Sequence, residues 1–417
     1  MMARPTVRAE DHRRGVLMMF RVRLASRNTL CVLLAAAALA GCGGAGGPTP
    51  DQLGGGTTPP AQQATAFPPN TIGTGPVKVA LILPLTATGN AGEVGQSMRN
   101  SAELAMTQFE TDIQVLPRDD AGNSVTAQQV TQQAIDEGAE LILGPLFSTS
   151  VQSVGQVARA RNIPVIAFST DSSVAGRGVY LLSLLPETDV TRIVDYAVSQ
   201  GKRSFLALIP DNAYGGVVEV QFRQDVATKG GRIVAVERYS TAKPNELLRA
   251  VVQAAASADA LFIPGDAESV PAVVQALSIA GVNLRQLQLL GTGLWEDQRI
   301  FAAPALQGGW YVAPDPSGPN NYKSFAARYR AKFGSEPART ASLSFDAVTL
   351  VAALAKTQGT KRFMPDVLTT ASGFTGTDGV FRLRPDGTNQ RGLAVLRVTP
   401  KGGEVVSPAP RTFASGT

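Results

Sequence analysis

Histidine and cysteine are almost absent from this chain of 417 residues. The one histidine is His12, and the two cysteines are Cys31 and Cys42. His12 and Cys31 lie within residues 1–41, which we interpret below as a cleaved leader. The remaining chain then has no histidine and one cysteine, which excludes a Ser-His-Asp triad, a Cys-His pair, an ordinary zinc site and an internal disulfide. We therefore expect no enzyme, no cofactor and no metal site, although a carboxylate- or lysine-based enzyme stays open.

An excess of basic charge is also missing once the first residues are set aside. The net charge of +5 comes from 38 Lys and Arg residues against 33 Asp and Glu residues. Residues 1–41 hold seven of the basic residues and two of the acidic ones, so the rest of the chain has 31 of each. Since nucleic-acid-binding proteins carry basic patches, we expect no nucleic-acid partner.

Residues 1–41 have the features of a bacterial lipoprotein signal peptide. Three arginines precede the apolar run 30–40, which is too short to span a bilayer as a permanent helix. The run ends in Leu39-Ala40-Gly41-Cys42, which resembles a lipobox. The resemblance implies that the chain is cleaved before Cys42 and that Cys42 is then lipidated. Gly43, the residue after this cysteine, favours sorting of the lipoprotein to the outer membrane. An ordinary signal peptide with an incidental cysteine is the alternative, and the start codon (Met1, Met18 or Met19) stays open.

Large apolar side chains are scarce in residues 42–76, which are rich in Gly, Pro, Thr, Gln and Ala and carry one charge, Asp51. Such a segment cannot bury enough surface to offset its ordering entropy. We therefore interpret 42–76 as the lipidated cysteine and a flexible tether. A coil of 34 residues typically reaches roughly 30–35 Å. The lipid anchor would be the only membrane contact of a folded body facing the periplasm.

From Val77 onward, short apolar runs alternate with helical spacing, which is typical of doubly wound α/β sheets. The first series predicts strands at 77–83, 113–116, 141–143, 165–167 and 179–185, with helices at 125–137 and 151–161. The second predicts strands at 204–209, 233–239, 260–264, 288–291 and 308–312, with helices at 190–200, 217–229, 245–256 and 270–280. Helices at 322–333 and 342–356 and a hairpin within 374–398 follow. We predict a first lobe of 77–186 with 315–372, a second lobe of 187–314 with 373–400, and a loose tail, 401–417.

Small hydroxyl residues follow two neighbouring strands of the first lobe. Ser148 and Thr149 come after the strand at 141–143, and Ser169 and Thr170 come after the strand at 165–167. Ligands of open α/β sheets bind at the carboxyl ends of the strands. Hydroxyls and free helix N-terminal N–H groups suit a carboxylate or another small polar anion. Helix capping is the alternative role for these residues.

Two further strand ends carry polar residues. Tyr214 follows the strand at 204–209 and would face the same cleft from the second lobe, unless it packs locally beside its Gly-Gly turn. Asp119 and Asp120 follow the strand at 113–116. For this pair we favour turn formation and capping over metal binding.

Taken together, these segments resemble the Leu/Ile/Val-binding proteins, a group of type I periplasmic binding proteins, over roughly residues 77–400. The resemblance is carried by Pro84-Leu85-Thr86, Gly144-Pro145-Leu146, Ile163-Pro164-Val165-Ile166, Asp211 with Tyr214-Gly215, Phe345-Asp346-Ala347 and Phe374-Thr375-Gly376. It implies two lobes joined by three crossings that close over a ligand. It also implies that Ser148, Thr149, Ser169 and Thr170 hold a ligand carboxylate, with Tyr214 helping from the other lobe.

The loop after the strand at 288–291 departs from this pattern. Family members that bind amino acids hold the ammonium with an acid where this sequence has Gly293, so Glu296 or Asp297 would have to replace it. The stretch 291–297 is instead similar to that of penicillin-binding protein activator lipoproteins, which stimulate peptidoglycan synthases. Trp295 would then be a cleft wall or an interface anchor, with core packing as the alternative.

Two functions follow as expectations. One is a receptor for an amino-acid-like or carboxylated solute that feeds an ABC permease. The other is a regulator that contacts a peptidoglycan synthase. An outer-membrane anchor disfavours the first, because an importer permease lies in the other membrane.

Overall fold

The computed structural model describes residues 71–108, 113–240, 248–318 and 321–413. The predicted leader, Cys42 and most of the predicted tether lie outside these residues. Within the described ranges, no helix is both long and apolar enough to cross a membrane.

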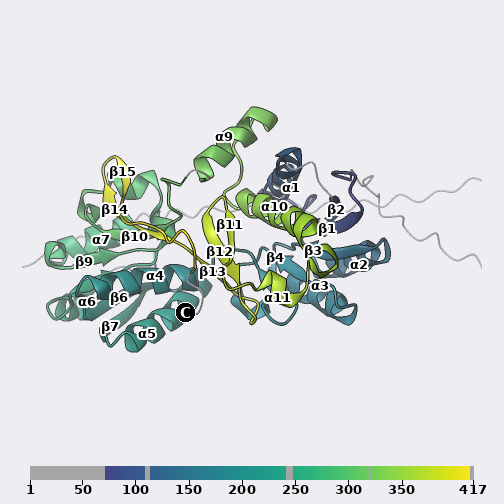
Figure 1. The fold of residues 1–417 in the computed structure, drawn as a ribbon. Helices are drawn as coiled ribbons and strands as arrows, with labels where there is room; N and C mark the ends of the chain where they lie inside the picture. Colours follow the sequence, from purple (N-terminus) through teal and green to yellow (C-terminus); the bar gives the residue numbers. More distant parts are fainter. Residues whose placement is uncertain (1–70, 109–112, 241–247, 319–320, 414–417) are drawn as a thin grey trace, which may run out of the picture. The chain divides into compact units, whose positions relative to one another are not determined.

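The first sheet is parallel and has the strand order β2-β1-β3-β4-β5. Its strands are β1 (Val77–Leu83), β2 (Ile113–Asp119), β3 (Ala139–Leu143), β4 (Val165–Ala167) and β5 (Val179–Leu181). Helices α2 (Ser124–Asp136) and α3 (Ser148–Ala160) pack on one face, while α1 (Asn90–Gln108) and α10 (Ala341–Thr357) pack on the other (Figure 1). Alternate residues of β1 enter the two cores, which is why this strand reads as a continuous apolar run.

The second sheet has the order β15-β14-β10-β9-β8-β6-β7. Its parallel strands are β6 (Ser204–Pro210), β7 (Arg232–Tyr239), β8 (Ala260–Phe262), β9 (Gln288–Leu290) and β10 (Trp310–Ala313). Strands β14 (Ala394–Thr399) and β15 (Gly402–Ser407) continue it in antiparallel fashion. Helices α4 (Pro186–Ser199) and α5 (Ala213–Thr228) cover one face, and α6 (Leu248–Ala255), α7 (Val270–Ile279) and α8 (Gln298–Ala302) cover the other.

The chain passes between the two lobes three times, as predicted. It does so between β5 and α4, between β10 and α9 (Tyr322–Phe333), and between β13 (Asn389–Arg391) and β14. A separate antiparallel sheet, β11-β12-β13, precedes the last crossing and contains β11 (Phe374–Gly376) and β12 (Gly379–Leu383); the short helix α11 (Pro365–Leu368) comes before it. The alternating strands and helices thus confirm the predicted fold class.

Three predicted boundaries are wrong. Residues 374–391, predicted in the second lobe, place Phe381 and Leu383 in the first lobe's core. The predicted tether ends too late, because Ile72 exchanges two backbone hydrogen bonds with Val115 (3.0 and 2.9 Å). The tail is not loose at 402–407, because β15 pairs with β14 along its length. Two of these errors concern short segments, Ile72 and β15, whose order comes from pairing with the edge of an existing sheet.

Candidate functional site

The two hydroxyl loops of the first lobe meet around an acid, Asp171. Ser169, which is buried, accepts a hydrogen bond on Oγ from the Asp171 N–H (3.1 Å). The Asp171 carboxylate accepts from the N–H and Oγ of Ser173 (3.0 and 2.6 Å), and the Ser148 side chain is close enough to help lower the pKa of this carboxyl. Thr149 and Thr170 are exposed. The structure therefore places Ser169 against the Asp171 N–H and Ser148 near the Asp171 carboxylate, so both hydroxyl loops have an acid of the chain itself beside them.

The charge of Asp171 alters what these loops can bind. The hydrogen bond from Ser173 is the main cause that lowers the pKa of this carboxyl, so the group is ionised at neutral pH. A second carboxylate placed among the same hydroxyls would meet like charge. Two donors of these loops, the N–H and the hydroxyl of Ser173, are already used by Asp171.

Tyr214 lies in a helix rather than in a loop. Asn212 caps α5 by accepting from the Gly215 N–H (2.8 Å), so Tyr214 occupies the first turn. Its hydroxyl lies 2.9 Å from the Thr292 Oγ1, and burial raises its pKa above the ordinary value. The tyrosine is therefore neutral and already paired with the loop that follows β9.

The interpretation of Trp295 as a cleft wall or interface anchor is wrong. Its side chain is fully buried in the second lobe, and its Nε1–H donates to the Ile263 carbonyl (3.1 Å). The ring lies so close to Gly291 that a Cβ there would come within 2.1 Å of it. The exposed apolar residue of this loop is the preceding one, Leu294, at 44% exposure. Because the short helix turns the two side chains in opposite directions, sequence adjacency hid the difference.

A carboxylate does lie beside Gly293, although the sequence did not indicate which one. Asp189, in the first turns of α4, accepts from the Gly293 N–H at 2.8 Å. A Cβ at position 293 would be 3.1 Å from the same oxygen. Burial raises the pKa of Asp189 to about 7. Glycine at 293 thus leaves room for an acid that arrives from a different element.

Neither of the two predicted substitutes serves this position. Glu296 accepts a hydrogen bond from the Tyr311 hydroxyl, and Asp297 caps α8 by accepting from the Arg299 N–H (2.8 Å). Asp119 and Asp120 likewise accept from nearby backbone N–H groups, those of Ala121 and Gly122. In the described part of the chain, no group of three or more His, Cys, Asp or Glu residues is arranged to hold a metal ion.

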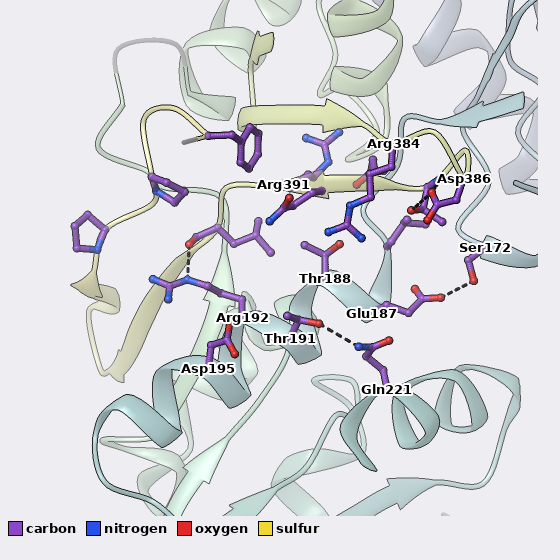
Figure 2. Close-up of a pocket in the computed structure, with 18 residues that line it drawn as sticks. Ser172, Glu187, Thr188, Thr191, Arg192, Asp195, Gln221, Arg384, Asp386 and Arg391 are labelled. Atoms are coloured by element: carbon purple, nitrogen blue, oxygen red, sulfur yellow. Dashed lines mark hydrogen bonds between the residues drawn. The ribbon is translucent and has the colours of Figure 1, made fainter. Parts of the chain in front are cut away.

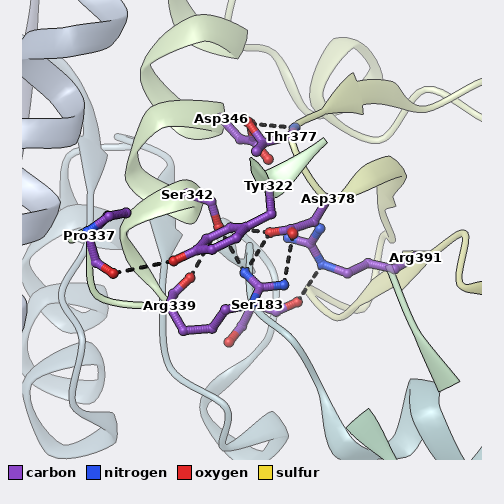
Figure 3. Close-up of polar contacts among 9 residues, drawn as sticks. All are labelled: Ser183, Tyr322, Pro337, Arg339, Ser342, Asp346, Thr377, Asp378 and Arg391. Atoms are coloured by element: carbon purple, nitrogen blue, oxygen red, sulfur yellow. Dashed lines mark hydrogen bonds and ion pairs between the residues drawn. The ribbon is translucent and has the colours of Figure 1, made fainter. Parts of the chain in front are cut away.

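A buried charge cluster, which we call the hinge cluster, includes residues at two of the crossings: Ser183 lies between β5 and α4, and Arg391 ends β13 (Figure 3). It contains Ser183, Arg339, Ser342, Asp346, Thr377, Asp378 and Arg391. Asp378, with no exposed surface, accepts from both Nη atoms of Arg339 (2.8 and 3.1 Å) and from the Ser342 Oγ (2.7 Å). The Thr377 N–H donates to Asp346 (2.7 Å). These contacts tie α10 to the turn between β11 and β12.

Some polar atoms of the hinge cluster have no partner among the described residues. Arg391 is 4% exposed and donates from Nε to the Ser183 carbonyl (2.8 Å), but its two Nη atoms make no hydrogen bond within the described chain. The Oδ2 atom of Asp346 is similarly unpaired. Burial, with a contribution from Asp378, raises the pKa of Asp346 to about 6. Sequence reasoning missed Arg391 altogether, because no local pattern distinguishes it from a surface arginine.

Comparison with known proteins identifies the family. Residues 76–404 match the periplasmic binding protein family. The chain belongs to that family. The match covers most of the chain and includes both lobes and the three crossings.

Curated proteins with similar sequences are named as penicillin-binding protein activators. The chain is 28% identical over 160 residues to "Penicillin-binding protein activator LpoA" of Pantoea ananatis, covering 37% of this chain and 22% of the relative. It is 26% identical over 172 residues to the Vibrio cholerae protein of the same name, covering 39% and 28%. The matched part thus spans about a quarter of the length of these relatives.

Solved structures share the fold at low identity. A branched-chain amino acid ABC transporter periplasmic ligand-binding protein from Burkholderia xenovorans aligns with a TM-score of 0.64 and 17% identity, over 81% of this chain and 95% of its own. An ABC transporter solute-binding protein from R. palustris in complex with benzoate aligns with a TM-score of 0.55 and 19% identity, over 82% and 98%. At this identity the likeness shows the fold alone.

Proposed function

We propose that this protein is a non-enzymatic binding protein of the cell envelope that regulates peptidoglycan synthesis by contact with a penicillin-binding protein. The observation that carries the proposal is Asp171. It occupies the hydroxyl loops that a carboxylated solute would need, so the most direct receptor mechanism meets like charge. The sequence relatives named as penicillin-binding protein activators support the same choice.

Exposed apolar side chains support a role in protein contact. Leu294 and Phe147 are 44% and 36% exposed, and each follows the carboxyl end of a sheet strand in its own lobe. Large apolar residues at exposed positions are common in protein interfaces when polar residues surround them. We propose that Leu294 takes the anchoring role that the sequence assigned to Trp295.

Attachment to the envelope completes this proposal. Cys42 would carry the lipid, and the segment that follows would let the folded part reach away from the membrane, which we propose to be the outer one. Mass spectrometry of the protein purified from membranes would show two acyl groups and an acylated amino terminus at Cys42. A mature chain that begins elsewhere, or lacks lipid, would contradict the anchor.

A reconstituted synthesis assay tests the regulatory function. The full-length lipoprotein in detergent is added to a penicillin-binding protein of the same cell, and the rates of glycan polymerisation and crosslinking are measured. We expect the wild type to increase both rates severalfold. With Leu294→Asp, about tenfold more protein should be needed for half-maximal stimulation. Ile279→Asp is the matched control, because Ile279 is 81% exposed on α7 of the same lobe. No stimulation by the wild type would contradict the proposal.

A second candidate function is the binding of an amino-acid-like solute, which Asp189 favours. Its carboxylate lies beside Gly293, where an ammonium group would otherwise lack a partner. Calorimetric titration with the twenty amino acids tests this candidate. Saturable binding that Ser169→Ala with Thr170→Ala abolishes would favour it. Unchanged affinity in that double variant would remove the hydroxyl loops from the site.

A further inference from the structure

A second polar pocket borders the loop that follows β4, since Ser172 of that loop is among the residues that line it. Its volume is about 680 Å³, within the range of small-molecule sites. One wall comes from the first turns of α4 and from α5, and the opposite wall comes from β13 and the turn between β12 and β13 (Figure 2). None of the residues predicted from the sequence to bind ligand, Ser148, Thr149, Ser169, Thr170, Tyr214 and Trp295, lines it.

One wall of this pocket presents unused positive charge. Arg384 lies in the β12–β13 turn and is exposed, and its guanidinium makes no hydrogen bond or ion pair within the described residues. Arg391, from the same wall, is buried with two unpartnered Nη atoms. The third arginine, Arg192, is already used, since it donates to the Leu393 carbonyl (2.8 Å) and to the Ser407 Oγ (2.7 Å). Arg384 is thus the cation best placed for an external anion.

The pocket also presents acceptors that lack donors. Glu187, on α4, accepts from the Ser172 Oγ with Oε1 (2.6 Å), while its Oε2 is buried and unpartnered within the described chain. Asn389 is 3% exposed and donates from Nδ2 to the Leu181 and Ser183 carbonyls (2.9 Å each), which fixes the orientation of its amide. Its Oδ1 is therefore an acceptor, and it is unpartnered too. A buried acceptor without a donor is costly, so a ligand that supplies N–H groups would be favoured here.

The acids that remain in the pocket are engaged by the chain itself. Asp195 pairs with Lys229 (2.8 Å), and Asp386 accepts from the N–H and Oγ1 of Thr388 (2.8 and 2.7 Å). Free groups of both kinds therefore remain: a cation on one wall, and acceptors at Glu187 and Asn389. A simple phosphate would satisfy the cation and repel Glu187. The carboxyl end of a peptide offers an anion and amide N–H groups a few ångströms apart.

We propose that this pocket binds the carboxyl end of a short peptide, with Arg384 taking the carboxylate and Glu187 and Asn389 accepting from the peptide's N–H groups. The inference goes beyond the proposed function, because it concerns a different site from the hydroxyl loops and from Leu294. Residues 408–413, which follow β15, contribute to the enclosure. Pro408, Pro410 and Phe413 line the pocket, and Phe413 packs on Arg382 with 4.9 Å between ring centre and guanidinium carbon.

Calorimetric titration of the full-length protein with three probes tests the proposal. The probes are tri-alanine, its carboxyl-terminal amide and free alanine. We expect saturable binding of tri-alanine below 10 mM, with at least tenfold weaker binding of the amide because it lacks the negative charge. Free alanine should bind at least tenfold more weakly than tri-alanine, since it has no peptide N–H. Absence of tri-alanine binding, or binding of either other probe with the same affinity as tri-alanine, would overturn the proposal.

Variants locate the binding to this pocket. Arg384→Ala and Glu187→Gln should each weaken tri-alanine binding at least fivefold, while Arg177→Ala, an exposed arginine outside the pocket, should not change it. Ser169→Ala should also leave it unchanged, which separates this site from the hydroxyl loops. Because Arg384 and Arg177 are exposed, the Arg384→Ala and Arg177→Ala variants should have the same melting temperature as the wild type when no peptide is bound. Tri-alanine affinity that Arg384→Ala leaves intact would contradict the assignment. Failure of synthase stimulation alone would leave this binding result standing.

Discussion

The two polar regions of this protein differ in whether their groups already have partners. In the hydroxyl loops, the Asp171 carboxylate accepts from Ser173, and the Asp171 N–H donates to Ser169. In the second polar pocket, Glu187 and Asn389 keep buried acceptors without donors among the described residues. Residue type suggested the first region as the binding site, since serine and threonine at strand ends often hold anions. The difference teaches that the state of the hydrogen bonds, rather than the residue types, shows where a ligand would gain most.

The hinge cluster is a third polar region, and there the ion pairs and hydrogen bonds stabilise the fold. We expect Arg339→Ala to lower the free energy of unfolding by about 3 kcal/mol, because Asp378 would keep a buried charge without its bidentate partner. Urea denaturation measures the loss. Arg330→Ala is the control, since its pair with Glu336 is largely exposed and should be worth less than about 1 kcal/mol. Equal losses in the two variants would show that the cluster is not a stabilising anchor.

The buried carboxyl of Asp189 makes the stability of the protein depend on pH. Its pKa is raised from 3.8 to about 7 on folding, so the folded chain binds more protons than the unfolded chain between these values. The stability contributed by this group is therefore present below about pH 4 and falls as the pH rises to about 7. Asp346, with a pKa raised to about 6, acts in the same direction.

Asp189→Asn should remove part of that slope. We expect the stability of the variant to fall less steeply than that of the wild type between pH 4 and 7, because an asparagine there has no proton to lose. Chemical denaturation at several pH values measures it, with Asp366→Asn, at an exposed position on α11, as the control. A parallel pH dependence in Asp189→Asn and the wild type would contradict the shifted pKa.

The smallest expected effect concerns Asp171 and tests directly whether its charge keeps anions out of the hydroxyl loops. Asp171→Asn removes the charge from the hydroxyl loops while keeping an acceptor for Ser173. We expect acetate to bind this variant at millimolar concentrations and the wild type not at all, as followed by amide chemical shifts near Ser148 and Ser169. Equal acetate binding by both proteins would show that Asp171 does not block an anion there.

Much of the fold could be predicted from the sequence, because buried parallel strands produce continuous apolar runs. Val77–Leu83 was predicted with the bounds that the structure has, and α9 was as well. Short pairing segments were missed: Ile72 and β15 have no strong pattern of their own. Their order depends on sheet edges formed by residues distant in the sequence.

The candidate sites divide in the same way. The sequence by itself determined the alternation of strands and helices and the absence of histidine after residue 12, because apolar spacing and composition are properties of the sequence alone. Tertiary structure alone decided that Asp171 lies near Ser148, that Asp189 lies beside Gly293, and that Trp295 is buried while Leu294 is exposed. The physical reason is that hydrogen bonds and burial depend on which distant segments the fold brings together, and no local pattern records that.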